Sequence, residues 1–172
     1  MVVTTSIANF TIRTATVTDI PLILSFIKEL AEYEKLSNEV VATEEILAES
    51  LFGEHSSSSA EVVIGYYKKE PVAFALFFHN FSTFLGKPGL YLEDLYVNPG
   101  MRGKGIGKVL ILYLANLAKK RGCGRFEWWV LDWNKSAIQF YHSIGAKPMG
   151  EWTVQRVDGE ALDQLANEFE VS

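Results

Sequence analysis

The residue types that this sequence uses sparingly already exclude several kinds of protein. It contains one cysteine, Cys123, so a disulfide cannot form within the chain, and a lone thiol fits a reducing compartment. No apolar run approaches the roughly 18 residues that a membrane-spanning helix needs. The N-terminal residues lack the basic segment and the following apolar segment of a signal peptide. We therefore expect a cytoplasmic protein.

Positive charge is also scarce, with 16 lysines and arginines against 21 aspartates and glutamates. The net charge of −5 argues against nucleic acid and anionic membranes as partners, and mildly favours cationic ones. His55, His79 and His142 do not show the spacing of metal ligands, either with one another or with Cys123. We therefore expect no metal site, no nucleic acid and no membrane.

Apolar residues, in contrast, are plentiful. They make up 48% of the chain and aromatic residues 13%, which excludes a disordered protein. A chain of 172 residues buries about two thirds of the surface that it exposes when unfolded. We expect one domain that covers residues 1–172.

Helix patterns and strand patterns follow one another along the chain. Apolar residues at helical spacing follow the N-cap pair Thr18-Asp19, and a second helix is expected from Thr43, with an acidic first turn. Their mixture with strands predicts an α/β (mixed α+β) fold with a central βαβα stretch. Further helices are expected after the glycines up to Gly122, at residues 134–144 and at 161–169. Strands are expected at 9–13, 60–67, 71–80, 89–97, 125–131 and 152–157, and a serine-rich connector at 53–61.

The segment RGKGIGK, residues 102–108, places three glycines and three cations where a helix begins. The first turn of a helix exposes unpaired N–H groups and a partial positive charge, and glycines let a ligand approach the backbone closely. The arrangement suits a phosphate or diphosphate. The glycine spacing does not fit the dinucleotide pattern, and the nucleoside-triphosphate loop would need Ser or Thr where Val109 stands. A tight left-handed turn before an ordinary surface helix remains the alternative.

Three blocks of the sequence carry a family resemblance. Arg102, Gly105 and Gly107 match the pattern Arg/Gln-x-x-Gly-x-Gly/Ala of the diphosphate turn in GNAT N-acetyltransferases. YLEDLYV (91–97) is similar to the strand before that turn, and VLDWNKSAIQFYHSIGA (130–146) to the family's asparagine-then-tyrosine helix. IRTATVTDI also resembles the first strand and turn. Within the family, the chain resembles the spermidine/spermine (diamine) N-acetyltransferases, and among them the branch that acts on thialysine, the sulfur analogue of lysine.

The resemblance implies a central twisted mixed β-sheet flanked by helices, a homodimer, and direct acetyl transfer from acetyl-CoA to a primary amine. It also implies that neighbouring strands diverge at a bulge beside residues 95–97, where backbone groups hold the pantetheine arm. The cofactor-binding residues that it implies are Leu95, Tyr96, Val97, Arg102, Gly103, Lys104, Gly105, Ile106, Gly107, Lys108, Asn134, Lys135, Ser136 and Tyr141.

The reaction needs a base and an acid. An alkylammonium with a pKa near 10.4 leaves about one molecule in 2500 neutral at pH 7, so a base is needed. Glu93, among apolar strand neighbours that would partly desolvate it and raise its pKa, is the expected base, unless it is a surface carboxylate. Asp94 would point to the opposite face and be structural. Tyr141, two helical turns after Asn134, is the expected acid that protonates the thiolate, unless it packs in the core beside Phe140.

The acceptor residues implied by the resemblance are Tyr33, Glu34, Glu93, Glu127, Trp128 and Trp129. Trp128 and Trp129 should face opposite ways, so one of them belongs to the core. Ser82-Thr83-Phe84 stands where the spermidine/spermine enzymes carry an acidic residue, proline and tryptophan, which favours a lysine-like amine or short diamine over spermine. Tyr33 and Glu34 could equally form a solvated helix end. Two other functions stay open, namely a protein or peptide amine acetyltransferase and a non-catalytic acyl-CoA sensor.

Overall fold

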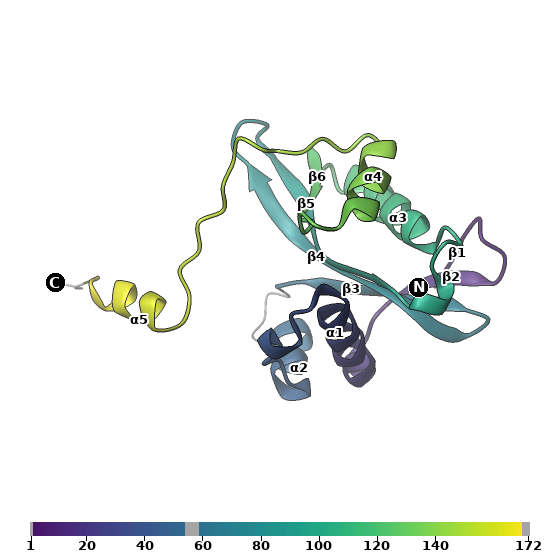
Figure 1. Ribbon diagram of the computed structural model, residues 1–172, viewed down its shortest axis with the longest axis horizontal. Helices are drawn as coiled ribbons and strands as arrows, with labels where there is room; N and C mark the ends of the chain where they lie inside the picture. Colours follow the sequence, from purple (N-terminus) through teal and green to yellow (C-terminus); the bar gives the residue numbers. More distant parts are fainter. Residues whose placement is uncertain (1, 54–58, 170–172) are drawn as a thin grey trace. The chain divides into compact units, whose positions relative to one another are not determined.

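A single mixed β-sheet organises the N-terminal three quarters of the chain. The computed structural model describes residues 2–53 and 59–169, and within them six strands lie in the order in which they occur in the sequence (Figure 1). All neighbouring pairs are antiparallel except β5–β6, which is parallel. The strands are β1 (Val2–Thr4), β2 (Phe10–Thr14), β3 (Glu61–Tyr67), β4 (Glu70–Ser82), β5 (Lys87–Val97) and β6 (Arg125–Trp128).

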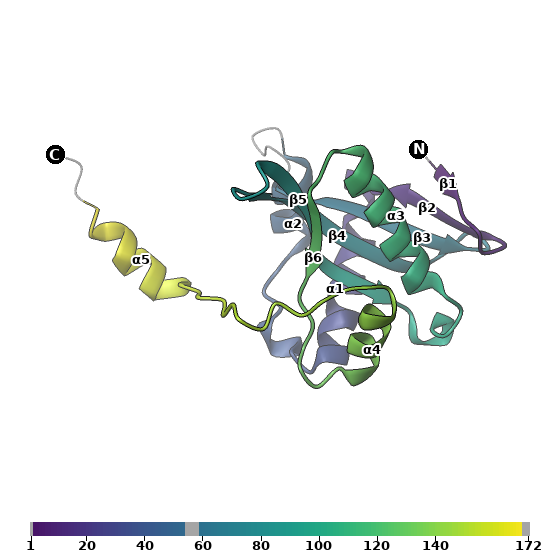
Figure 2. The same ribbon diagram turned by 90° about the horizontal axis from the view of Figure 1, so that it is seen from above.

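Helices cover both faces of this sheet. α1 (Ile20–Glu34) and α2 (Glu44–Phe52) lie on one face, and α3 (Ile106–Lys120) lies on the other, as Figures 1 and 2 both show. α3 is the crossover that connects β5 to β6. These two strands need such a connection because parallel neighbours cannot be joined by a tight turn. Short 3-10 turns, η1 (Val17–Asp19), η2 (Ser37–Glu39) and η3 (Pro99–Met101), connect these elements.

The chain divides into two units, residues 1–129 and 130–172. The first contains the sheet with α1, α2 and α3. The second contains α4 (Lys135–Ser143) and α5 (Gly159–Asn167), and none of its described residues is buried. That one domain covers residues 1–172 stays a prediction.

The core under α1 is aromatic. The rings of Phe26 and Phe74 stack with centroids 5.3 Å apart, and Tyr96 packs against Phe26 at 5.8 Å. On the opposite face, α3 buries Ile106, Leu110 and Leu114. The end of β5 that carries the site is therefore held between two packed helical layers.

Local signals in the sequence account for the start of the first two helices. Thr43 caps α2 by accepting a hydrogen bond from the Ile46 N–H at 3.3 Å. Asp19 precedes α1 and accepts two hydrogen bonds at 2.7 Å from the guanidinium of Arg13 on β2. This hydrogen bonding lowers the pKa of Asp19 to about 2. The ion pair therefore fixes α1 to the sheet.

The predicted α/β class is confirmed, and most predicted elements are present. One prediction is wrong: residues 152–157 form no strand, because apolar alternation does not make a strand without a partner to accept its hydrogen bonds. β6 ends at Trp128, three residues before the end of the strand predicted at 125–131, and β1 was not predicted. Part of the serine-rich connector at 53–61 lies outside the described residues. No helix within the described ranges combines the length and apolar character needed to cross a bilayer.

Candidate active site

The glycine turn lies between η3 and α3 and is built on left-handed backbone. Gly103 and Gly105 have φ values of 76° and 80°, a region that other residues enter only at a cost of about 1–2 kcal/mol. Gly105 is the N-cap of α3 and offers no side chain to its first N–H groups. The conformation of the turn therefore explains two of the three glycines without any ligand.

Gly107 needs a different explanation. It lies inside α3, where glycine is less favourable than alanine by about 1 kcal/mol, and its φ is not positive. A Cβ atom added there would meet Val97 Cγ2 at 3.8 Å, an ordinary contact. Neither the backbone nor the packing of the described residues therefore requires glycine at this position. Lys104 and Lys108 are exposed beside it.

An open edge of β5 leads to this turn. β6 pairs with β5 only from Gly89 to Leu92, so β5 continues beyond the end of its parallel neighbour. The Asn98 N–H donates to Val72 on the β4 side, so the Val97 carbonyl points to the open edge, where Arg102 Nε donates to it at 3.0 Å. In a strand, the backbone N–H and C=O groups of one residue point to the same side, and the side alternates from residue to residue. The Leu95 carbonyl and the Val97 N–H therefore face the open edge, whereas the backbone N–H and C=O of Tyr96 face β4. β6 does not pair with β5 beyond Leu92, and the backbone of Tyr96 does not contribute to the resulting open edge.

A β-bulge in β5 changes the expected arrangement of the carboxylates. Leu76 and Phe77 are adjacent on β4 but pair with Asp94 and Leu92, so Glu93 is an extra residue without a partner on β4. Glu93 is exposed, so the desolvation expected of it is not found. The half-buried carboxylate is Asp94, whose pKa is raised to about 6 by burial, then by the charges of Glu93 and Glu34.

Glu34 completes this acidic group from the last turn of α1. Burial also raises the pKa of Glu34 above its usual value. Three carboxylates from two elements therefore interact on the first unit, and two of them favour protonation more than usual. Such a group attracts a cation, because a nearby ammonium would stabilise the ionised carboxylates. Asp94, which strand alternation had made structural, interacts electrostatically with both Glu93 and Glu34, and amine binding by Glu34 and Glu93 stays a prediction.

Glu127 is placed less favourably for an acceptor. Its carboxylate forms an ion pair with Arg125 at 2.8 Å and accepts a hydrogen bond from Asn80 at 3.0 Å, so its charge is already compensated. Trp129 is 58% exposed, and its ring meets that of Tyr91 edge to face at 6.0 Å. Trp128 is half-buried. Neither tryptophan is a buried core residue, which corrects the expectation for one of them.

The second unit contains four of the residues predicted to bind the cofactor. Asn134 is the N-cap of α4 and accepts hydrogen bonds at 3.3 Å from the Ala137 N–H and from the Ser136 hydroxyl. Lys135 is the first residue of the helix, and Tyr141 is half-buried, with its ring 5.4 Å from that of Phe140. Asn134 thus has a structural role as a cap, and α4 begins and ends where the sequence predicts.

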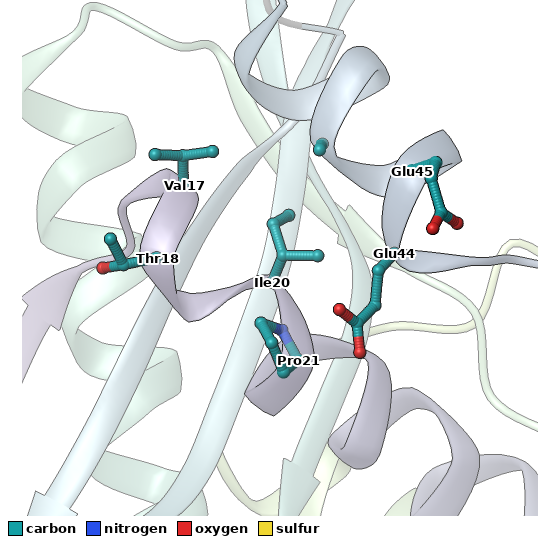
Figure 3. Close-up of a pocket in the computed structure, with 7 residues that line it drawn as sticks. Val17, Thr18, Ile20, Pro21, Glu44 and Glu45 are labelled. Carbon is teal, nitrogen blue, oxygen red and sulfur yellow. The ribbon is translucent and has the colours of Figure 1, made fainter.

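A hollow elsewhere in the first unit contains none of the predicted residues. Figure 3 shows it between the start of α1 and the start of α2. Glu44 and Glu45 lie in the first turn of α2, where carboxylates stabilise the positive end of the helix. Glu44 and Glu45 therefore have a structural role in α2, and the hollow lies where the starts of the two helices pack together. Its lining residues are Val17, Thr18, Ile20, Pro21, Glu44, Glu45 and Ala48.

The profile of the acetyltransferase (GNAT) family matches residues 27–146, more than half of the chain. This chain belongs to the GNAT family. The match includes the glycine turn, the bulged strand and α4. As a GNAT protein it is an N-acetyltransferase, and enzymes of this family use acetyl-CoA and an amine acceptor.

Two relatives and one solved structure are similar to this chain over most of its length. A thialysine N-epsilon-acetyltransferase of Sus scrofa is 41% identical, over 92% of this chain and 98% of the relative. An L-ornithine N5-acetyltransferase of Arabidopsis thaliana is 32% identical, over 90% of this chain and 86% of the relative. An integron cassette protein from the mobile metagenome of V. cholerae has a TM-score of 0.76 at 29% identity, over 92% of this chain and 98% of that one.

Proposed function

We propose that this GNAT enzyme transfers the acetyl group of acetyl-CoA to the side-chain amine of a lysine-like amino acid, such as thialysine, or to a short diamine. The acidic group of Glu34, Glu93 and Asp94 carries this proposal, because it offers an ammonium several carboxylates at the bulge of β5. The thialysine and ornithine enzymes among its relatives act on amino acids with a side-chain amine, which supports the same acceptor class.

Acetyl-CoA fits the geometry of the glycine turn and the open edge of β5. We assign the diphosphate to the N–H groups of residues 103–108 and the pantetheine amides to the Leu95 carbonyl and the Val97 N–H. The supporting observation is that the protein has space for a Cβ atom at residue 107 and yet carries glycine there. A ligand that lies close to the backbone would explain this. Asn134, Lys135, Ser136 and Tyr141 are proposed to contribute to cofactor binding from the second unit.

The chemistry then divides between two groups. A carboxylate of the Glu93–Asp94 pair accepts a proton from the acceptor ammonium, directly or through water, and the neutral amine attacks the thioester carbonyl. Asp94 suits this role because a pKa of about 6 is closer to neutral pH than that of an ordinary carboxylate. As the C–S bond breaks, the Tyr141 hydroxyl protonates the departing thiolate, and the second proton, which the nitrogen loses on becoming an amide, restores the Tyr141 hydroxyl. No covalent enzyme intermediate is needed.

The two carboxylates can be separated by the pH dependence of the rate. If Asp94 is the base, Asp94→Asn removes the acid limb of the kcat/KM profile, whereas Glu93→Gln shifts that limb to lower pH, since the neighbouring charge that raises the pKa of Asp94 is lost. An acid limb that disappears only in Glu93→Gln would assign the base to Glu93.

The β4–β5 hairpin bears on acceptor choice through its shape. Ser82 is buried, and its hydroxyl accepts a hydrogen bond from the Leu85 N–H at 3.3 Å, so it orders the hairpin and cannot bind an amine directly. The segment Ser82-Thr83-Phe84 also carries no carboxylate that could bind a second, distant ammonium. We accordingly propose that spermine is a poor substrate compared with lysine-like amines.

An amine panel tests the function. The full chain is incubated with acetyl-CoA and, separately, thialysine, lysine, ornithine, putrescine, spermine and a peptide with a free N-terminus, and CoA thiol release is measured. We expect the highest kcat/KM for an amino acid with a side-chain amine. Highest activity on the peptide would make the acceptor a protein, and acetyl-CoA binding without release on any amine would make the chain a sensor.

We also propose that the enzyme is a cytoplasmic homodimer. Apolar side chains of the second unit are exposed, and a second copy of the chain could cover them. Static light scattering would report the mass of the particle, and a mass of one chain at assay concentration would contradict a dimer. The exposed side chains include Leu131, Trp133, Met149, Trp152, Val154, Val157, Leu162, Leu165 and Phe169.

A further inference from the structure

Arg102 connects the glycine turn to the end of α1. It follows η3 directly and is the first residue of the RGKGIG segment, yet its guanidinium lies over the ring of Tyr33, 4.4 Å from the centroid. Tyr33 is in the last turn of α1. A residue predicted to contact the cofactor and one predicted to contact the amine therefore contact each other.

Two further contacts fix the guanidinium from other sides. The Nε of Arg102 donates a hydrogen bond to the Val97 carbonyl at 3.0 Å, and its Cζ atom lies 5.8 Å from the centroid of the Tyr96 ring. The Tyr96 ring is itself fixed, because it is buried and its hydroxyl donates to Glu29 at 2.6 Å. One wall of the arginine site is therefore part of the core, and Tyr33 is the other wall.

The contacts use only part of what an arginine offers. A guanidinium has five N–H donors, and Nε accounts for one of them. The four N–H groups of its two terminal nitrogens have no hydrogen-bond partner among residues 2–53 and 59–169. Arg102 is thus an exposed side chain that is held in place while its anion-binding groups stay available, an arrangement that suits bidentate binding of a phosphate.

We propose that Tyr33 is a positioning residue for this arginine: its ring holds the Arg102 guanidinium at the glycine turn, so the affinity for the diphosphate of acetyl-CoA depends on the last turn of α1. The proposal rests on the proposed function, in which that turn binds the diphosphate. The alternative role of Tyr33, contact with the amine alone, predicts a different set of binding constants.

The experiment measures the Kd of coenzyme A by calorimetry with the full chain and no amine present. Tyr33→Leu removes the aromatic face and is expected to weaken binding by roughly three- to tenfold, the range of a cation–π contact at a partly exposed site. Tyr33→Phe keeps the face and is expected to retain the affinity. Tyr33→Gln is a second variant that is also compatible with a helix, and melting curves verify that each variant folds.

A double-mutant cycle identifies the partner of Tyr33. In an Arg102→Ala background, Tyr33→Leu should have no further effect on the Kd of coenzyme A, since the group that it positions is gone. An equal loss in both backgrounds would contradict the proposal, as would a Tyr33→Leu variant with unchanged Kd and a raised KM for the amine. If the unaltered chain fails to bind coenzyme A, the proposed function fails with it; binding that is insensitive to Tyr33→Leu refutes the positioning role alone.

Discussion

The Asp94→Asn substitution should make the protein more stable and less active. Burial and the charges of Glu93 and Glu34 raise the pKa of Asp94 from 3.8 to about 6. The folded state therefore binds a proton at Asp94 more tightly than the unfolded state does. Stability that is fully present below about pH 4 is lost as the pH rises to about 6.

The magnitude follows from the size of the shift. Two pKa units correspond to about 3 kcal/mol, and the partial exposure of Asp94 reduces the expected effect to about 1–2 kcal/mol at pH 7. Asparagine has nearly the same shape and carries no charge, so the variant avoids this cost. For a chain of this size the gain corresponds to a rise in Tm of roughly 2–8 °C.

Urea unfolding at pH 7 and pH 4 measures the effect. We expect Asp94→Asn to exceed the unaltered protein in free energy of unfolding at pH 7 and to match it near pH 4, while its kcat/KM for amine falls. Asp132→Asn, at an exposed aspartate, is the matched control and should change neither value. A variant that is equally stable or less stable at pH 7 would refute the claim that the folded protein disfavours the charge at Asp94.

Four other substitutions have expected outcomes. Tyr141→Phe should lower turnover by about tenfold or more with unchanged acetyl-CoA affinity, and unchanged turnover would remove its role as acid. Gly107→Ala should raise the Tm, because neither φ nor packing requires glycine there, and should weaken acetyl-CoA binding if the proposed diphosphate site is correct; Gly105→Val should weaken binding and also lower the Tm, because the φ of Gly105 is 80°. Asp19→Asn should cost about 2 kcal/mol at pH 7, a contribution that is lost in the unaltered protein as the pH falls from about 4 to about 2, and equal urea midpoints for variant and parent would contradict the importance of its pair with Arg13.

The elements that the sequence predicts well are those that local forces determine. The apolar period of α1 and the cap at Thr43 depend on residues within one or two turns, and both are found in the structure. Residues 152–157 have the alternation of a strand, but a strand also needs a neighbour, and sequence alternation does not reveal whether one is present. β1 was missed because three residues are too few to show a period.

Contiguous motifs can be recognised in the sequence, whereas features that depend on strand register cannot. The glycine turn and the helix after Asn134 are recognisable in one stretch of sequence. The sequence did not indicate the raised pKa of Asp94, because alternation along β5 assumes a regular ladder, whereas the bulge exists only relative to β4. The stacking of Arg102 on Tyr33 joins residues far apart in the chain, and no local pattern announces it.

The unopposed position of Glu93 has a consequence for how this sheet tolerates changes in length. Leu92 and Asp94 pair with adjacent residues of β4, so a chain lacking residue 93 could form an uninterrupted ladder with every later side chain still on its present face. Deleting a residue from a central strand normally turns every later side chain to the opposite face of the sheet. Here the deletion would instead remove the bulge. The sheet could therefore tolerate the loss of this residue, and the protein would lose the bulge together with a carboxylate that we propose for the chemistry.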